Sequence, residues 1–201
     1  MIARSSLLIL AVALALSVEE PSAAVVPSNL GTLLAAARGV PDAVCVLAAD
    51  GVASGGWGSG FQAPALPVRS DLRASIRALR EGALSSGETR GLVASLAASD
   101  ACERHLAAVL LGRAGDRSVA PEIAGRLASS WAPERAAALV ALGMMEAAGE
   151  ADAIARVLGD PSADVRANAA WALGRAEVRT TAPPVQTLLR DDVSVVRAAA
   201  A

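Results

Sequence analysis

The chain has 201 residues, enough for one globular domain or for an elongated array of repeats. Hydrophobic residues make up 54% of it but aromatic residues only 2%, so alanine and leucine carry the apolar content and favour packed helices over a β-sandwich. All 18 basic residues are arginine, and the net charge of -2 argues against a general nucleic-acid binder, which needs a basic excess.

Residues 1–24 have the pattern of a signal peptide. Arg4 lies in a short n-region, an apolar run of 12 residues extends over 7–18, and small residues at 22–24 form a cleavage site. The run is shorter than the ~20 residues that cross a bilayer as a helix. We expect a bacterial protein exported to the periplasm, the cell envelope or the medium. The alternative is an uncleaved anchor, and membrane association is expected only in that case.

Residues 25–68 are predicted to form an irregular helical region with a Gly-rich loop. One short helix is expected from Ser28 or Asn29 to a stop at Gly39, and a second over 40–51. Trp57 lies in the loop "GVASGGWGSG", where it either packs onto the helices, which we favour, or contacts a ligand.

The chain has two cysteines, Cys45 and Cys102. They are expected either to form one disulfide, which suits an oxidising compartment, or to be two buried thiols. The sequence does not give the distance between them, so both alternatives stay open.

The next helix, predicted over 69–83, has an unusual charge pattern. Four arginines share one face, next to an apolar face: Arg69, Arg73, Arg77 and Arg80. Like charges at this spacing disfavour a helix slightly unless acids, an anion or a membrane neutralise them. We interpret the stripe as the solvated face of a degenerate repeat over 69–91, with a partner contact as the alternative.

Residues after Leu92 repeat with a period of 31. Glycines recur at Gly112, Gly143 and Gly174, and arginines at Arg104, Arg135, Arg166 and Arg197. Three apolar columns share the register: Leu92, Ile123, Ile154 and Val185; Leu96, Leu127, Leu158 and Leu189; and Val109, Val140 and Trp171. Five columns in one register indicate a tandem array.

Each unit is predicted to be a helix pair. In the third unit Asp160 caps the second helix, which runs from about Ala163 to Leu173, and Gly174 ends it in a left-handed conformation. The next helix starts near Ala182, with two prolines in its first turn.

A pair of this size cannot bury its own apolar face, so the predicted fold is all-α, an α-solenoid of stacked antiparallel pairs. Its units are 92–118, 119–149, 150–180 and an incomplete 181–201. Because the last unit stops within a helix, we expect the chain to be a piece of a longer array.

The segments "LGDPSADVRANAAWALGRA" and "LLRDDVSVVRAAAA" resemble HEAT-like repeats of the type named after phycobilisome lyases. The resemblance covers 92–201. It implies a ladder in which an Asp of the inter-helix turn pairs with the Arg of the second helix, here Asp160 with Arg166 and Asp191 with Arg197. Earlier units depart from this pattern, because Ala98 and Ser129 replace the Asp, although Asp100 can substitute in the first.

Groups that carry catalysis are scarce. His105 is the one histidine, in a column otherwise filled by alanine, and we interpret it as packed on its helix. No Cys or His cluster has metal-ligand spacing, and no phosphate loop or nucleophile motif is present in the sequence. We therefore expect neither a cofactor nor a metal.

The favoured function is an exported scaffold that binds a protein or peptide, with no catalysis of its own. The alternatives are a sensor or regulatory region of a larger exported protein, and a lyase-like enzyme subunit, which only the resemblance suggests.

Two tryptophans in the array are interpreted differently. Trp131 lies in an inter-helix turn, where an exposed Trp often marks a contact surface, although packing on the neighbouring turn is an equal alternative. Trp171 occupies an apolar column and is expected in the core.

Overall fold

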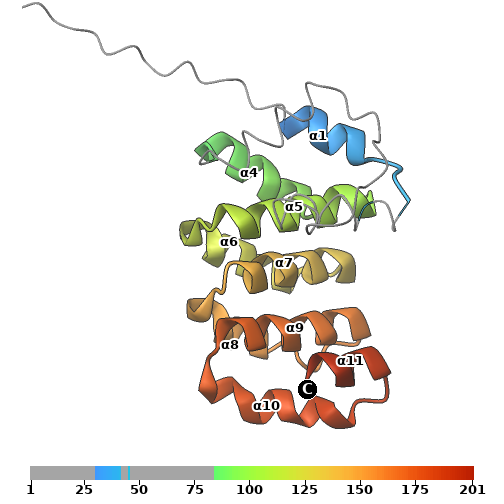
Figure 1. The fold of residues 1–201 in the computed structure, drawn as a ribbon, viewed down its shortest axis with the longest axis vertical. Helices are drawn as coiled ribbons and strands as arrows, with labels where there is room; N and C mark the ends of the chain where they lie inside the picture. Colours follow the sequence, from blue (N-terminus) through green and yellow to red (C-terminus); the bar gives the residue numbers. More distant parts are fainter. Residues whose placement is uncertain (1–29, 42–44, 46–83) are drawn as a thin grey trace, which may run out of the picture.

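A computed structural model describes residues 30–41, 45 and 84–201, and every regular element in these residues is a helix (Figure 1). The expected signal peptide, the helix over 69–83, Trp57 and the stripe of Arg69, Arg73, Arg77 and Arg80 lie outside the described residues, as does most of the expected helix over 40–51. No helix in the described part is long and apolar enough to cross a membrane.

Helix α1 (Leu30–Ala37) is followed by helix pairs. Their first members are α4 (Ser86–Ser95), α6 (Ala120–Gly125), α8 (Ala151–Ala155) and α10 (Ala182–Thr187). Their second members are α5 (Ala101–Ala114), α7 (Ala132–Met144), α9 (Ala163–Ala176) and α11 (Ser194–Ala199). Short 3-10 turns precede α6, α8 and α10 at Arg117–Val119, Ala148–Glu150 and Arg179–Thr181, and others follow α6 and α10 at Arg126–Ala128 and Leu188–Arg190.

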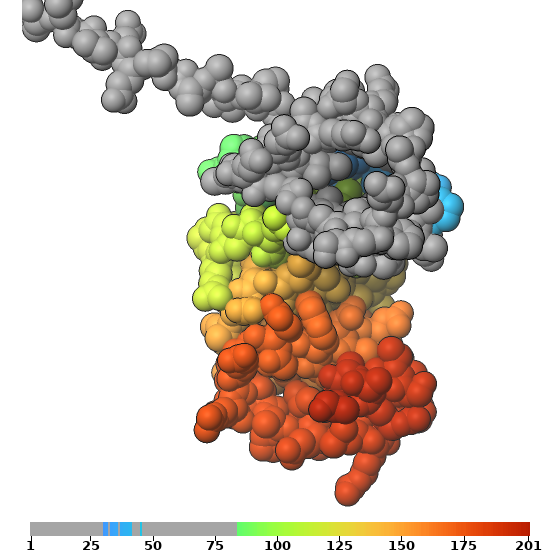
Figure 2. All heavy atoms as spheres, viewed as in Figure 1, coloured from blue at the N-terminus to red at the C-terminus, as the bar shows by residue number. Residues whose placement is uncertain are grey.

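The pairs stack into a layered body consistent with an α-solenoid. Helices α5, α7, α9 and α11 each contact the next one along the stack, and α6 and α8 pack against α7 and α9 (Figure 1). The colours in Figure 2 follow one another along the long axis, because each unit contacts its sequence neighbours. Stacking of this kind buries apolar faces that one helix pair leaves exposed.

The apolar columns of the first helices form much of the core. Leu92, Ile123 and Ile154 are fully buried, and the column that follows is buried at Leu96, Leu127 and Leu158. Burial weakens in the last described layer, where the side chain of Leu189 is 46% exposed.

The prediction that Trp171 is a core residue is wrong. Its side chain is 38% exposed, whereas Val109, its counterpart on α5, is buried. The indole lies against Gly143 of α7, where the absence of a side chain makes room for the ring. The indole is larger than the valines it replaces, and part of it remains at the surface.

The repeated glycines do not end their helices, contrary to prediction. Helices α5, α7 and α9 each continue past the glycine, and the left-handed residues come three positions later, at Gly115, Glu146 and Glu177 (φ 65°, 51° and 54°). Gly112 and Gly143 instead allow close packing, because a Cβ would overlap Met144 at the first and the Trp171 ring at the second.

Two helix starts bear on the predicted boundaries. Helix α4 begins at Ser86, six residues before the predicted unit boundary at Leu92, because Ser85 and Glu88 form a capping box. Helix α10 begins at Ala182 with its prolines in the first turn, as predicted. The predicted stop at Gly39 is confirmed: α1 ends at Ala37, and Gly39 is left-handed with a φ of 73°.

Candidate functional site

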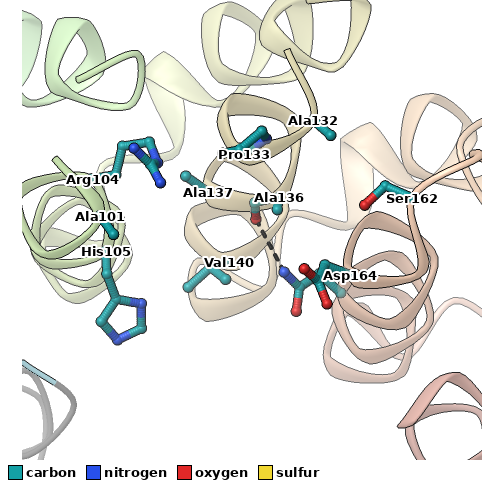
Figure 3. A pocket seen from close by; sticks show the side chains of 11 residues that line it. Ala101, Arg104, His105, Ala132, Pro133, Ala136, Ala137, Val140, Ser162 and Asp164 are labelled. Atoms are coloured by element: carbon teal, nitrogen blue, oxygen red, sulfur yellow. Dashed lines mark hydrogen bonds between the residues drawn. The ribbon is translucent and has the colours of Figure 1, made fainter. Parts of the chain in front are cut away.

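The second helices α5, α7 and α9 enclose a hollow of about 330 Å³ (Figure 3). Small residues of α7 form its floor, among them Ala132, Ala136 and Ala137. Because alanine side chains are short, adjacent helices leave space between their longer neighbours. The sequence pattern of alanine-rich second helices therefore produces a surface recess as well as close packing.

Polar side chains stand at opposite sides of this hollow. Arg104 and half-buried His105 come from α5, and Asp164 and Asn168 come from α9 (Figure 3). The Asn168 Nδ2 donates a hydrogen bond to the Ala136 carbonyl at 3.4 Å. The hollow thus has a basic side and an acidic side with apolar alanines between them.

The repeated arginines share one anchoring contact. Each donates from Nη1 to the backbone carbonyl six residues earlier, at 2.6–2.9 Å, in the turn that leads into its helix: Arg104 to Ala98, Arg135 to Ser129, Arg166 to Asp160 and Arg197 to Asp191. This contact satisfies a turn carbonyl and fixes the plane of each guanidinium.

The carboxylate partners of the arginines lie in the following repeat. Arg135 donates from Nε and Nη2 to the two carboxylate oxygens of Asp160, both at 2.8 Å. Arg166 binds Asp191 in the same bidentate way at 2.8 and 2.9 Å. Both pairs are nearly buried, so each ties one layer to the next through charge-assisted hydrogen bonds.

The predicted pairs of Asp160 with Arg166 and of Asp191 with Arg197 are therefore wrong in partner. Only the backbone carbonyls of these aspartates accept from the arginine six residues later. The carboxylates point to the preceding layer and also accept from the backbone N–H two residues on, at Ser162 and Val193. Asp160 does not cap α9, because Ser162 occupies the N-cap position.

These contacts lower the pKa of both carboxyl groups. For Asp191, the hydrogen bonds from Arg166 and from the Val193 N–H hold the pKa well below its usual range. For Asp160, burial raises the pKa, but the hydrogen bonds from Arg135 and the Ser162 N–H outweigh it, and the net shift is downward. Both groups remain charged acceptors at neutral pH.

The contact between α5 and α7 is different, because Ser129 stands where an Asp would meet Arg104. Trp131, the N-cap residue of α7, lies two positions further on, and the Arg104 Cζ is 4.6 Å from its ring centroid. Trp131 is 38% exposed. It packs on the neighbouring repeat and still presents surface to solvent, so features of both predicted alternatives are present.

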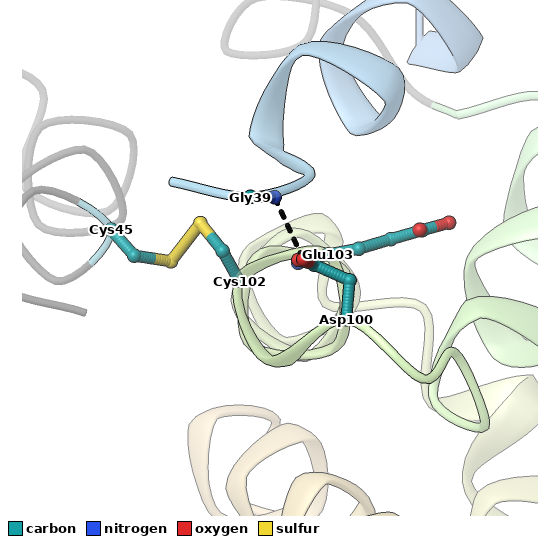
Figure 4. Close-up of a disulfide and its surroundings, with 5 residues drawn as sticks. All are labelled: Gly39, Cys45, Asp100, Cys102 and Glu103. Carbon is teal, nitrogen blue, oxygen red and sulfur yellow. Dashed lines mark hydrogen bonds between the residues drawn. A yellow bond between two sulfur atoms is a disulfide. The ribbon is translucent and has the colours of Figure 1, made fainter. Parts of the chain in front are cut away.

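Asp100 does not take the place of the missing Asp. One of its carboxylate oxygens caps α5 by accepting from the Glu103 N–H at 2.9 Å, and the other accepts from the Gly39 N–H at 2.8 Å (Figure 4). The Gly39 hydrogen bond is the main cause that lowers the pKa of Asp100. Asp100 thus joins α5 to the segment after α1 rather than to the next repeat.

A disulfide links Cys45 to Cys102 at the start of α5, with Cα atoms 5.5 Å apart (Figure 4). Beside it, Arg38 Nε donates to Glu103 at 2.7 Å. Neither Arg38 nor Glu103 was singled out from the sequence, since a pair 65 residues apart leaves no local pattern. Three separate contacts therefore hold the N-terminal segment on α5.

One comparison with known proteins is informative. Residues 151–201 match the family of HEAT repeats. The match covers the two C-terminal helix pairs, whose layers are joined by the Arg166–Asp191 contact. It supports a HEAT-like repeat character for these two pairs. No curated protein matches the chain.

Within the described residues, no group of three or more His, Cys, Asp or Glu side chains is placed to hold a metal ion. HEAT repeats are generally protein-interaction scaffolds and are typically not catalytic. The hollow on the second helices is accordingly a candidate binding surface.

Proposed function

We propose that this protein is an exported HEAT-repeat scaffold that binds a protein or peptide along its second helices. The observation that carries the proposal is the hollow between α5, α7 and α9, with an alanine floor and polar groups at either side. Binding surfaces combine such apolar recesses with a few polar groups that fix orientation. The general role of HEAT repeats as interaction scaffolds supports it.

A repeat period of 31 residues is part of the proposal. It is supported by the first residues of the second helices, Ala101, Ala132, Ala163 and Ser194, and by the arginines that follow each at the same offset. A regular period places equivalent residues of successive layers side by side, which makes an extended surface.

Export is proposed from the signal-peptide pattern of residues 1–24 and is supported by the Cys45–Cys102 disulfide. Disulfides persist in oxidising compartments and are rare in the cytosol. Edman sequencing of the protein purified from its host checks this directly: we expect a mature N-terminus near Val25, and a chain that still begins at Met1 contradicts export by cleavage.

Site-specific photo-crosslinking tests the binding surface. A photoreactive amino acid replaces Ala136 in the hollow, and a matched variant carries it at exposed Asp152 on α8. We expect one defined crosslinked partner from position 136 and none from 152 when the protein is expressed in its host. The purified partner should then bind the purified protein. Equal crosslinking from both positions, or none from 136, contradicts the proposal.

A further inference from the structure

We call each arginine-centred contact between successive second helices a rung; within the described residues, the rung between α5 and α7 has an arginine but no carboxylate. Arg104 uses Nη1 as Arg135 and Arg166 do, yet in the described part of the chain no carboxylate accepts from its Nε and Nη2. In the other two rungs those nitrogens bind both oxygens of an aspartate. In Arg104, the edge of the guanidinium formed by Nε and Nη2 is therefore already oriented to bind a carboxylate.

Ser129 explains why the turn between α6 and α7 does not supply this carboxylate. Its Oγ accepts from the Trp131 N–H at 3.2 Å, the same turn contact that Asp160 and Asp191 make two residues on. Its side chain ends there and has no second oxygen for Arg104. The nearest acid on α7, Glu134, is engaged by Arg126 at 3.1 Å and by Ser129 at 2.7 Å.

Trp131 holds the Arg104 guanidinium without using its in-plane donors. An indole attracts the cation through its face, whereas carboxylates bind in the guanidinium plane. Stacking therefore orients the group and leaves the Nε–Nη2 edge for a ligand. The electrostatics agree: hydrogen bonding to Asp191 raises the pKa of Arg166, whereas burial lowers the pKa of Arg104.

The hollow is large enough for more than a small anion. Arg104 lines it, its floor is alanine, and its far side carries Asp164 and Asn168. A ligand here meets apolar surface beyond the cation, as a peptide segment does. Opposite charges on the two sides also give such a segment a direction.

We propose that Arg104, held by Trp131, binds an Asp or Glu side chain of a partner peptide that lies in the hollow. The partner thereby provides in trans the carboxylate that Asp160 and Asp191 provide within the chain. This inference rests on the proposed function, because it names the chemistry of the partner at that surface.

The test uses the 15N-labelled full-length protein and the capped peptide Ac-Ala-Ala-Glu-Ala-Ala-NH2. We expect a saturable shift of the Arg104 Nε–H resonance, assigned by its loss in Arg104→Gln, together with a shift of the Trp131 indole N–H. The same peptide with Gln in place of Glu should bind at least about tenfold more weakly, because the charge-assisted contact is lost. Inorganic phosphate is titrated into the same labelled protein as a third ligand, beside the Glu and Gln peptides.

A self-filling variant sharpens the test. Ser129→Asp combined with Glu134→Val introduces the residues that the α9 repeat has at these positions, Asp160 and Val165. The new carboxylate should bind Arg104 within the chain and weaken peptide binding at least about tenfold. Arg197→Gln is the matched control for Arg104→Gln, since Arg197 has the same carbonyl anchor but does not line the hollow. It should bind like the wild type. If the double variant does not fold, Trp131→Ala replaces it, with weaker binding expected.

Several results overturn the inference: no saturable Arg104 shift, equal binding of the Gln peptide, or undiminished binding by the folded self-filling variant. Phosphate binding without peptide binding overturns it as well. If crosslinking from position 136 persists while the peptide fails to bind, the carboxylate inference falls and the scaffold stands. If the peptide binds and no partner crosslinks, the proposed scaffold function falls instead.

Discussion

The two ends of the described stack are held together by different means. Between α7 and α11, one contact recurs, an arginine bound by both oxygens of an aspartate in the next repeat. Between α1 and α7, each connection is of its own kind: a disulfide, the Arg38–Glu103 ion pair and the stacking of Arg104 on Trp131. The backbone contacts of the arginines are nevertheless the same in both parts.

This difference shows which part of a repeat is fixed by geometry and which part is open to change. The arginine anchor satisfies a backbone carbonyl that the turn would otherwise leave unpaired, so every unit keeps it. The carboxylate satisfies the arginine and one backbone N–H of the turn, and at Arg104 these two roles fall to Trp131 and Ser129. The irregular contact between α5 and α7 borders the candidate binding surface, whereas the two aspartate contacts at the regular end tie successive layers together.

The largest expected effect is the loss of the disulfide at the irregular end. Replacing Cys45 and Cys102 by alanine should lower the free energy of unfolding by about 3–4 kcal/mol, because the bond closes a long loop in the unfolded chain. Denaturant unfolding measures this, and the wild type in reductant should match the double variant. Unchanged stability in reductant would mean that the Arg38–Glu103 ion pair and the Gly39–Asp100 hydrogen bond hold this end.

Breaking a regular rung should have the next largest effect. Asp160→Ala leaves Arg135 nearly buried without its carboxylate and should cost about 2–3 kcal/mol. Asp192→Ala is the control: Asp192 meets Arg166 at 3.3 Å, but its side chain is 88% exposed, so the change should stay within about 0.5 kcal/mol. Equal effects in urea unfolding would show that the rungs do not tie the layers together.

Replacing glycine by alanine should change stability in opposite directions at the two ends of the glycine column. Gly112→Ala puts a Cβ against Met144 of the next helix and should destabilise by about 1–3 kcal/mol. Gly174→Ala meets nothing within 4 Å inside α9 and should stabilise by about 0.5–1 kcal/mol. Thermal unfolding compares them, and a stabilised Gly112→Ala would rule out close packing as the reason for that glycine.

The smallest effect is expected at the stacked rung. Trp131→Ala should lower stability by about 1 kcal/mol, because a partly exposed cation–π contact contributes little. Trp131→Phe retains an aromatic ring and should lower stability by less than Trp131→Ala does. A loss as large as that of Asp160→Ala, measured in the same unfolding series, would make Trp131 a structural residue equal to the aspartates.

Local signals in the sequence predicted the helical class, the buried columns and the prolines of α10. These features follow from side-chain periodicity and from backbone chemistry within one turn of helix. The candidate site was only partly predictable. Arg104 stood out because arginine recurs at its position, and Trp131 stood out because it departs from the repeat. Arg38, Glu103 and Glu134 gave no signal, because their contacts depend on which layers meet.

The sequence by itself therefore determined which faces of the helices are apolar and where arginine recurs, since both are one-dimensional patterns. Only the tertiary structure decided the direction of each contact. Asp160 binds Arg135 of the preceding layer, Trp171 lies against Gly143, and Arg104 stacks on Trp131. The physical reason is that a spacing along the chain fixes a position on a helix. It does not fix which neighbouring layer the side chain faces when the helices stack.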